Sequence, residues 1–204
     1  MASLLNMSGG SLLNKGLPYD AEIEYLESSG TQWIDTLYKM KLYDELKFKV
    51  YCFNPNGSAI FGARGGAYTN FYQVYIESMA AQLCFGQHSR TYDVIKGFQN
   101  HGINEIIIKN GLCVCNEVNT SIPSGNEDSL QNLAIFARRN QDSTVLYLIK
   151  MRLYYFKIYS NNVLVRDFIP VRVGTIGYLY DKVSGQLFGN AGTGSFILGS
   201  DKTN

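Results

Sequence analysis

Two carboxylates near the start of the chain have the spacing that a catalytic pair would use. Glu22 and Glu24 alternate in the sequence, so a strand through them would place both side chains on one face. Retaining glycosidases need two carboxyl groups about 5 Å apart, and inverting ones need about 6.5–9.5 Å. Ile23 and Tyr25 take the opposite face, however, and this pattern is typical of a strand with a solvated polar side. We therefore expect no catalytic residue and no enzyme activity.

Cysteine and histidine offer little further chemistry. Cys113 and Cys115 are two residues apart, so a strand would point both to one face, where they are poorly placed for a disulfide with each other. A metal site would need His88 or His101 beside them, but no second ligand pair stands at zinc-finger spacing. We expect all four cysteines to be reduced and to pack as small apolar side chains.

Loops that combine aromatic and polar residues are the best candidates for ligand contact. Aromatic rings stack on the faces of sugar rings, while amide, carboxylate and guanidinium groups satisfy the hydroxyls. Three segments have this composition, residues 64–72, 87–92 and 138–142. Their candidate carbohydrate-binding residues are Arg64, Tyr68, Asn70, Tyr72, His88, Arg90, Tyr92, Arg138, Arg139 and Asp142. The single tryptophan, Trp33, is better explained by core packing.

Cofactor motifs are missing from the sequence. No Gly-x-Ser-x-Gly motif presents a serine, and the glycine-rich run at 190–194 is not followed by a lysine and a helix, so neither a hydrolase elbow nor a phosphate loop is expected. Calcium is left open and unassigned, because Glu127, Asp128 and Asp142 lie in expected loops without the regular spacing of a calcium loop. We expect no cofactor.

Composition favours one β-rich domain. The chain has 204 residues, of which 46% are hydrophobic and 17% charged, which is enough to bury one core. Its 20 glycines, 15 tyrosines and 11 phenylalanines suit a β-sandwich, since aromatic residues favour pleated surfaces and glycines supply the corners. A net charge of +1 without a basic block argues against a nucleic-acid partner. No run approaches the roughly 18 apolar residues of a membrane span.

Alternation and turn signals place the strands from Tyr19 onward. The cleanest hairpin spans residues 104–116, where Asn110-Gly111 is the dipeptide that best suits a type I′ turn. Pro170 is expected to end or edge the strand before it. The other predicted strands span residues 21–27, 31–36, 45–53, 58–64, 71–77, 81–85, 91–95, 131–137, 143–155, 155–160, 163–168, 177–181, 186–188 and 195–198.

Both ends of this pattern resemble a known family. The opening block EIEYLESSGTQWIDT (residues 22–36) and the short aromatic strands of residues 149–199 together resemble a concanavalin A-like, laminin G-type jelly roll. Such domains recur in tail, fibre and other virion proteins of bacteriophages and in surface proteins of gut bacteria. The resemblance implies an all-β, antiparallel β-sandwich whose last strands pair with its first, and a binding or structural module.

The first eighteen residues differ from the rest. SLLN occurs at residues 3–6 and again at 11–14, and the segment lacks the basic start and continuous apolar run of a signal peptide. The leucines would be exposed if the segment floated free, so we expect an extended arm (1–18) that anchors on a neighbouring subunit, followed by a lectin-like sandwich (19–204). The partner-binding residues are Leu4, Leu5, Leu12 and Leu13.

Together these inferences predict a non-enzymatic bacteriophage virion protein, made in the host cytoplasm. It would be a capsid decoration, a head fibre or a part of the tail or its fibres, and oligomeric in the assembly. Its partners would be other virion proteins and, through the outward-facing sandwich, glycans of the host surface. The alternative is a free-standing carbohydrate-binding protein of a gut bacterium, which would need an export signal. A glycoside hydrolase is the least favoured hypothesis.

Overall fold

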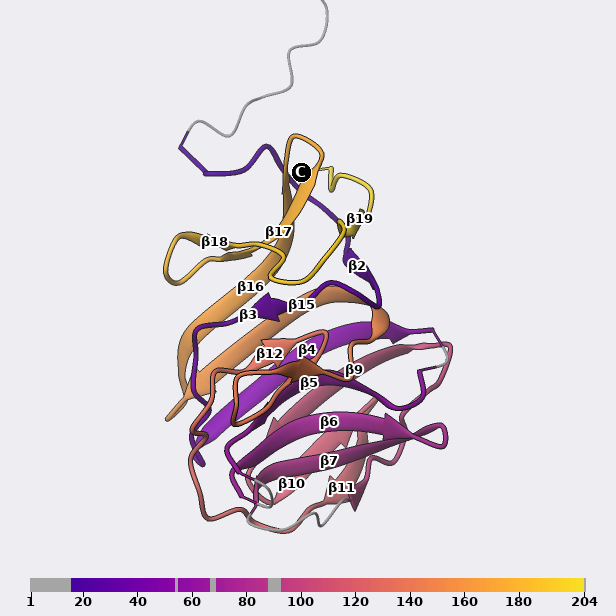
Figure 1. Ribbon diagram of the computed structural model, residues 1–204, viewed down its shortest axis with the longest axis vertical. Helices are drawn as coiled ribbons and strands as arrows, with labels where there is room; N and C mark the ends of the chain where they lie inside the picture. The colour runs from indigo at the N-terminus through magenta and orange to yellow at the C-terminus, as the bar shows by residue number, and fades with distance from the viewer. Residues whose placement is uncertain (1–15, 54, 67–68, 88–92, 204) are drawn as a thin grey trace, which may run out of the picture.

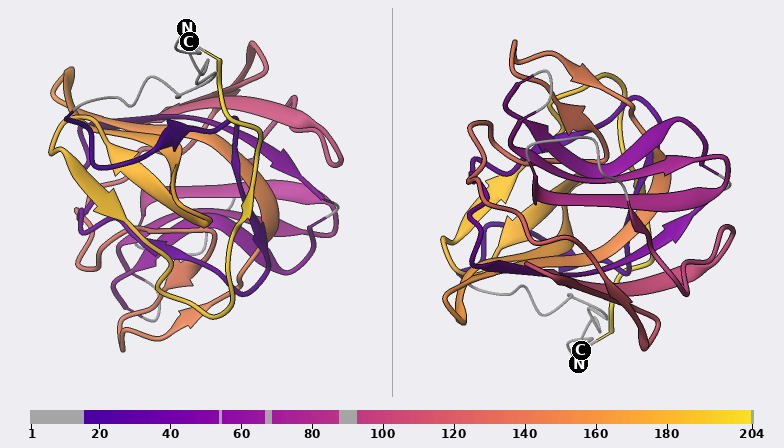
Figure 2. Two further views of the ribbon diagram at one scale, coloured as in Figure 1. Left: turned by 90° about the horizontal axis from the view of Figure 1, so that it is seen from above. Right: turned by 90° about the horizontal axis from the view of Figure 1, so that it is seen from below.

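The computed structural model is an all-β sandwich (Figure 1). It describes residues 16–53, 55–66, 69–87 and 93–203, and this part of the chain contains no helix. The strands form two sheets, which the end-on views of Figure 2 show as separate curved layers. The sequence prediction of an antiparallel β-sandwich is confirmed.

The larger sheet holds eleven of the described strands. They are β1 (Ala21–Glu22), β2 (Leu26–Ser29), β4 (Asp44–Cys52), β9 (Ile103–Lys109), β10 (Leu112–Cys115), β11 (Val118–Ser121), β15 (Lys150–Ser160), β16 (Val163–Val173), β17 (Ile176–Asp181), β18 (Gln186–Phe188) and β19 (Ile197–Leu198). The main path runs β11-β10-β9-β4-β15-β16-β17-β18, so the two long strands β4 and β15 lie side by side near its middle.

The smaller sheet holds the other eight described strands. They are β3 (Ile34–Asp35), β5 (Ser58–Arg64), β6 (Phe71–Glu77), β7 (Ala80–Gln87), β8 (Asp93–Val94), β12 (Ala134–Ile135), β13 (Arg138–Arg139) and β14 (Val145–Leu146). One pairing in this sheet is parallel, between β13 and β5, where Arg139 lies opposite Ala63. The sandwich is therefore mixed at this edge.

The core lies between the two sheets and follows from the alternation of β4. Its inward side chains are fully buried, while Lys47 and Lys49 point outward. Phe48 stacks on Phe156 of β15, with ring centroids 5.3 Å apart, and meets the edge of Phe61 of β5 at 5.5 Å. The contact with Phe61 joins the two sheets, whereas that with Phe156 lies within the larger sheet, and each adds about 0.5–1.5 kcal/mol beyond the burial of its area.

The last strands pair with the first, as the resemblance implied. β19 pairs with β2, and an isolated bridge joins Ile23 to Asp201. The predicted strand 21–27 is wrong as one unit, because β1 pairs with β16 whereas β2 pairs with β15. The start of the described chain and the C-terminal residues consequently lie at one end of the sandwich, beside the β16–β17 hairpin (Figure 1).

Pro170 lies inside β16, so the prediction that it ends or edges a strand is wrong. Its carbonyl oxygen accepts a hydrogen bond from the N–H of Ile23 at 3.0 Å. In an antiparallel strand the nitrogen and oxygen of one residue point to the same side, so the missing N–H also faces this side. There the partner of β16 changes from β15, which ends its pairing at Phe168, to β1, which begins at Val171. Pro170 therefore lies where the neighbouring strand of β16 changes from β15 to β1.

The hairpin at 104–116 is confirmed, but its turn type is not. Of its two central residues only Gly111 has a positive φ, of +84°, whereas a type I′ turn needs both. Two positive φ values in succession occur instead at Asn116-Glu117 and at Asn161-Asn162, in the turns that follow β10 and β15. Positive φ at single residues also breaks two predicted strands, at Phe136 in 131–137 and at Tyr147 in 143–155.

Candidate functional site

Two of the three predicted sugar loops meet at one rim of the sandwich. Arg64 lines a small cavity of about 200 Å³ together with Asn140, Gln141 and Asp142. Its Nε donates to the carbonyl of Gly66 at 2.7 Å. The carboxylate of Asp142 accepts two hydrogen bonds from Thr144, which hold its pKa below the ordinary range of an aspartate. These groups shape the loops, and none of the described residues that line the cavity offers an aromatic ring.

The other described side chains of these loops contact neighbouring parts of the fold. Tyr72 is buried, and its hydroxyl donates to the carbonyl of Glu127 at 2.6 Å; burial is the main reason that its pKa is raised. Arg138 is also buried and lies over the ring of Tyr147. Asn70 donates its amide N–H₂ to the carbonyl of Asp128 at 2.9 Å. The geometry therefore assigns these side chains to holding the loops together.

Trp33 and Arg139 form a second internal pair. The guanidinium of Arg139 lies 5.3 Å from the centre of the Trp33 ring and forms an ion pair of 2.6 Å with Asp35. Trp33 is half-buried and packs against the core, as expected. The remaining predicted residues lie outside the part of the chain that the structure describes, and the predictions for them stand. They are Leu4, Leu5, Leu12, Leu13, Tyr68, His88, Arg90 and Tyr92.

Glu22 and Glu24, which the sequence placed on one strand, do not share a strand in the structure. β1 ends at Glu22, which accepts a hydrogen bond from the hydroxyl of Tyr19 at 3.2 Å. Glu24 lies beyond that strand, is exposed, and has its backbone N–H bonded to the carbonyl of Ser200. The two carboxylates therefore do not project side by side from one strand, as the alternation of the sequence implied.

All four cysteines are thiols buried in the core, and no group of three potential metal ligands occurs among the described residues. Cys113 and Cys115 both point inward from β10, as their spacing predicts. Burial raises the pKa of the thiols of Cys52, Cys113 and Cys115 to about 12. At neutral pH these thiols are protonated and inert, because the thiolate is the nucleophilic form.

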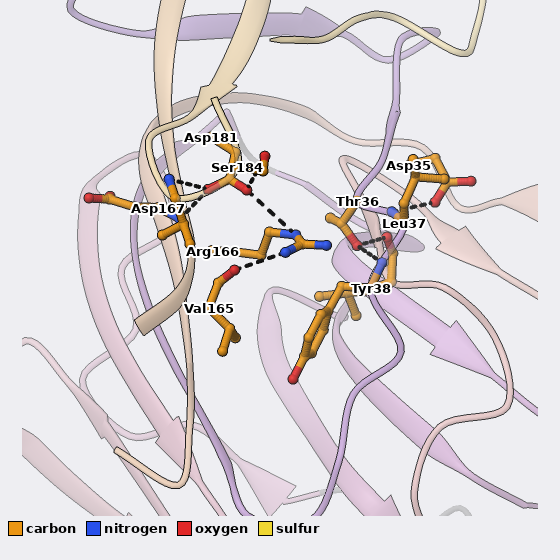
Figure 3. Close-up of polar contacts among 11 residues, drawn as sticks. Asp35, Thr36, Leu37, Tyr38, Val165, Arg166, Asp167, Asp181 and Ser184 are labelled. Atoms are coloured by element: carbon orange, nitrogen blue, oxygen red, sulfur yellow. Dashed lines mark hydrogen bonds and ion pairs between the residues drawn. The ribbon is translucent and has the colours of Figure 1, made fainter. Parts of the chain in front are cut away.

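A buried polar cluster holds the β17–β18 hairpin (Figure 3). The carboxylate of Asp181 is fully buried and accepts hydrogen bonds from the N–H of Asp167 at 2.8 Å, the N–H of Val183 at 3.1 Å and the hydroxyl of Ser184 at 2.7 Å. The guanidinium of Arg166 lies 3.7 Å away and extends toward Tyr38. Both carboxylate oxygens are thus used to shape the hairpin, which indicates a structural role.

The outer face of the larger sheet, which points away from the smaller sheet, is lined by tyrosines and lysines. In β15 the pairing with β4 shifts between Leu153, opposite Val50, and Tyr155, opposite Lys49. This is a β-bulge, which places one extra residue on the strand. Consequently Tyr154 and Tyr155 are both partly exposed on the outer side, although they are consecutive in the sequence.

Two open hollows adjoin these tyrosines. The first, of about 540 Å³, is lined by Glu24, Tyr25, Lys49, Arg152, Tyr154, Tyr155 and Lys202. The second, of about 400 Å³, is lined by Lys47, Tyr154, Tyr155, Lys157, Tyr159, Ile169 and Lys202. Because Tyr154, Tyr155 and Lys202 line both, the two hollows are parts of one surface, which we call the tyrosine groove.

Contacts with neighbouring side chains hold the rings of the tyrosine groove in place. Arg152 lies 4.3 Å from the centre of the Tyr25 ring and is itself fixed by a 2.6 Å ion pair with Glu27. The rings of Tyr25 and Tyr154 meet edge to face at 5.9 Å. The hydroxyl of Tyr155 donates to Glu105 at 2.7 Å, and burial together with this bond raises its pKa. The phenol of Tyr155 is therefore neutral at physiological pH.

Sequence reasoning missed this groove. Its elements are far apart in the chain, since Tyr25 precedes β2, Lys49 lies on β4 and Lys202 follows β19. The signal that was present is the Tyr154-Tyr155 dipeptide within an otherwise alternating strand. Strict alternation would bury one of these rings, and only a bulge exposes both.

Comparisons with known proteins give no family for this chain. No protein-family model matches it, and no curated protein is significantly similar to it. No helix in the described part of the chain is long and apolar enough to cross a membrane. The fold and the groove define a β-sandwich with a tyrosine- and lysine-lined face, and its function has to be argued from that face.

Proposed function

We propose that this chain is a non-catalytic glycan-binding module carried on a bacteriophage virion, and that the tyrosine groove is its glycan site. The observation that carries the proposal is the partly exposed pair Tyr154 and Tyr155, which a bulge presents between two adjoining hollows. A pyranose ring stacks on an aromatic face through its apolar C–H groups, and its hydroxyls need polar partners at the rim.

The groove supplies both kinds of contact. Tyr25 and Tyr159 extend the aromatic surface on either side of the pair, and Glu24 and the lysines provide acceptors and donors for sugar hydroxyls. Its size suits a ligand of a few sugar units, since typical ligand sites have volumes of about 300–1,000 Å³. Rings that are already held by Arg152 and Glu105 lose little conformational freedom on binding, which favours affinity.

The virion part of the proposal concerns the start of the chain. Asp20, which follows the predicted arm, lies at the β16–β17 turn, where its carboxylate accepts a 2.6 Å hydrogen bond from the N–H of Gly174. Leu17, Val173 and Ile176 are exposed there. Exposed apolar side chains beside a leucine-rich arm favour contact with a neighbouring subunit. The arm would anchor the module, and the groove would remain available to host-surface glycans.

Glycan binding is tested by removing the stacking rings. The variants Tyr154→Ala and Tyr155→Ala should each weaken binding to the best ligand of a glycan array about tenfold, because loss of a stacked ring costs about 1–2 kcal/mol. The matched control is Tyr43→Ala, which removes a tyrosine that is 48% exposed and does not line the groove. Thermal unfolding would verify that all three variants are folded. Wild-type affinity in both groove variants would reject the tyrosine groove as the glycan site.

Virion membership is tested separately, by peptide mass spectrometry of gradient-purified phage particles with the soluble lysate as control. Enrichment in step with the major capsid protein would support the proposal, and its copy ratio would separate a capsid decoration from a tail part. Absence from particles would reject it. A variant that lacks residues 1–15 should fold but no longer enter particles.

A further inference from the structure

The charges of the tyrosine groove are unevenly distributed. Its second hollow is lined by three lysines, Lys47, Lys157 and Lys202, and by no acidic side chain. In the first hollow Glu24 is the acidic residue of the lining, beside Lys49, Lys202 and Arg152, of which Arg152 is already paired with Glu27. A neutral sugar gains no electrostatic attraction from these positively charged side chains, whereas an anionic group does.

Two of these cations have no carboxylate partner within the described part of the chain. Lys47 pairs with Glu45 at 2.8 Å and Lys157 with Asp167 at 3.4 Å. The ammonium of Lys49 lies 5.9 Å from the centre of the Tyr154 ring. Neither Lys49 nor Lys202 forms an ion pair with any described residue. Lys49 and Lys202 are therefore available to a ligand.

The position of Lys202 is fixed by the end of the sandwich. Its N–H donates to the carbonyl of Glu22 at 2.9 Å, and the preceding residue, Asp201, receives two hydrogen bonds from Arg172 at 2.6 and 2.7 Å. The backbone is thus held at the point where Lys202 reaches both hollows. A lysine on a fixed backbone beside two aromatic rings can meet the charged substituent of a sugar that stacks on those rings.

Taking the proposed glycan function as its basis, we infer that the tyrosine groove selects acidic glycans, with Lys49 and Lys202 as the contacts to their anionic groups. The shared chemistry is a sugar ring that carries a negative charge, from either a carboxylate or a sulfate. Tyr154 and Tyr155 stack on the ring, while the two lysines neutralise the charge.

The test measures affinity for three polymers in parallel. Oligogalacturonate carries carboxylates, dextran sulfate carries sulfates, and dextran is neutral. The variants are Lys49→Gln, Lys202→Gln and the double variant, with Lys96→Gln as the matched control because Lys96 is exposed and does not line the groove. We expect the double variant to bind the preferred acidic polymer about five- to tenfold more weakly, since each exposed charge contact contributes about 0.5–0.7 kcal/mol. Lys96→Gln should bind like the wild type.

The outcomes separate this inference from the function on which it rests. Binding of dextran that equals the binding of both acidic polymers, without an effect of the lysine variants, would overturn the inference and leave glycan binding intact. Absence of binding to all three polymers, and to every neutral, carboxylated and sulfated member of a glycan array, would reject both. The acidic polymer that is preferred identifies the source of the charge. Binding should also weaken between 50 and about 500 mM salt, because exposed charge contacts are screened.

Discussion

The carboxylate of Asp181 provides the sharpest test of how this fold is held together. Replacement by alanine removes the acceptor of two backbone N–H groups, those of Asp167 and Val183, and the partner of Arg166. Replacement by asparagine keeps one oxygen, which can still accept from both N–H groups, and removes only the charge. The two variants therefore separate the acceptor role of Asp181 from its role as a counterion.

The magnitudes follow from burial. Asp167 is buried, so its N–H would lose its partner without gaining water, at a cost of about 1–3 kcal/mol. Val183 is 48% exposed, so water replaces the carboxylate at its N–H with little loss. The side chain of Arg166 is 23% exposed, so water partly replaces the carboxylate as its partner. We therefore expect the loss of this ion pair to cost about 1 kcal/mol. We expect Asp181→Ala to lower the free energy of unfolding by about 3 kcal/mol and Asp181→Asn by about 1 kcal/mol.

Equilibrium urea unfolding, followed by circular dichroism, measures both values from the midpoint at an unchanged slope. Ser184→Ala is the matched control, since it deletes one hydrogen bond to Asp181 at an exposed residue and should cost less than about 1 kcal/mol. Equal losses for the alanine and asparagine variants would show that the ion pair, rather than the buried N–H, carries the energy. A loss below 1 kcal/mol for alanine would refute the reasoning altogether.

Three further predictions concern packing and titration. A Cβ on Gly192 would collide with the carbonyl oxygen of Thr31, so Gly192→Ala should destabilise the fold by about 2–3 kcal/mol in urea unfolding. Gly174→Ala, which has open space around it and a φ of +57°, should cost only about 1 kcal/mol, and a reversed order would contradict the steric argument. Phe48→Ala should cost about 3–5 kcal/mol in the same assay, because it leaves a cavity between the sheets; a cost under 1 kcal/mol would show that Phe48 does not join them. The thiols of β4 and β10 have their pKa raised by burial from 9.0 to about 12, so stability that is fully present below pH 9 should be lost as the pH rises toward 12. A urea midpoint that stays constant from pH 9 to 11 would be inconsistent with protonated buried thiols.

The strands that could be predicted are those with a strong local pattern. The bounds of β5, β6 and β18 agree with the prediction to the residue, and β4 differs by one residue at each end. Period-two alternation and the turn residues that flank it are properties of adjacent residues, so the sequence displays them directly. The short strands β3 and β12 were predicted too long, because their length is set by the few residues that pair with each other across the sheet.

The turns were less predictable than the strands. Asn110-Gly111 has the composition of a type I′ turn, yet the structure uses such positive φ pairs at Asn116-Glu117 and Asn161-Asn162. The hydrogen bond from Gly125 to the Asn110 side chain, 2.8 Å long, shows that a distant loop packs on this hairpin. Contacts of this kind override local turn preference, as Pro170 inside β16 also illustrates.

By itself the sequence determined an all-β chain, the inward alternation of β4 and β10, and cysteines that face the core, because each depends only on residue type and on a period of two. The tertiary structure alone decided the tyrosine groove. A shift of one residue in the pairing of β15 with β4 turned Tyr154 and Tyr155 to the same side. Closure of the sandwich then brought Tyr25 and Lys202 beside them. Register and closure depend on partners far along the chain, and no local pattern encodes them.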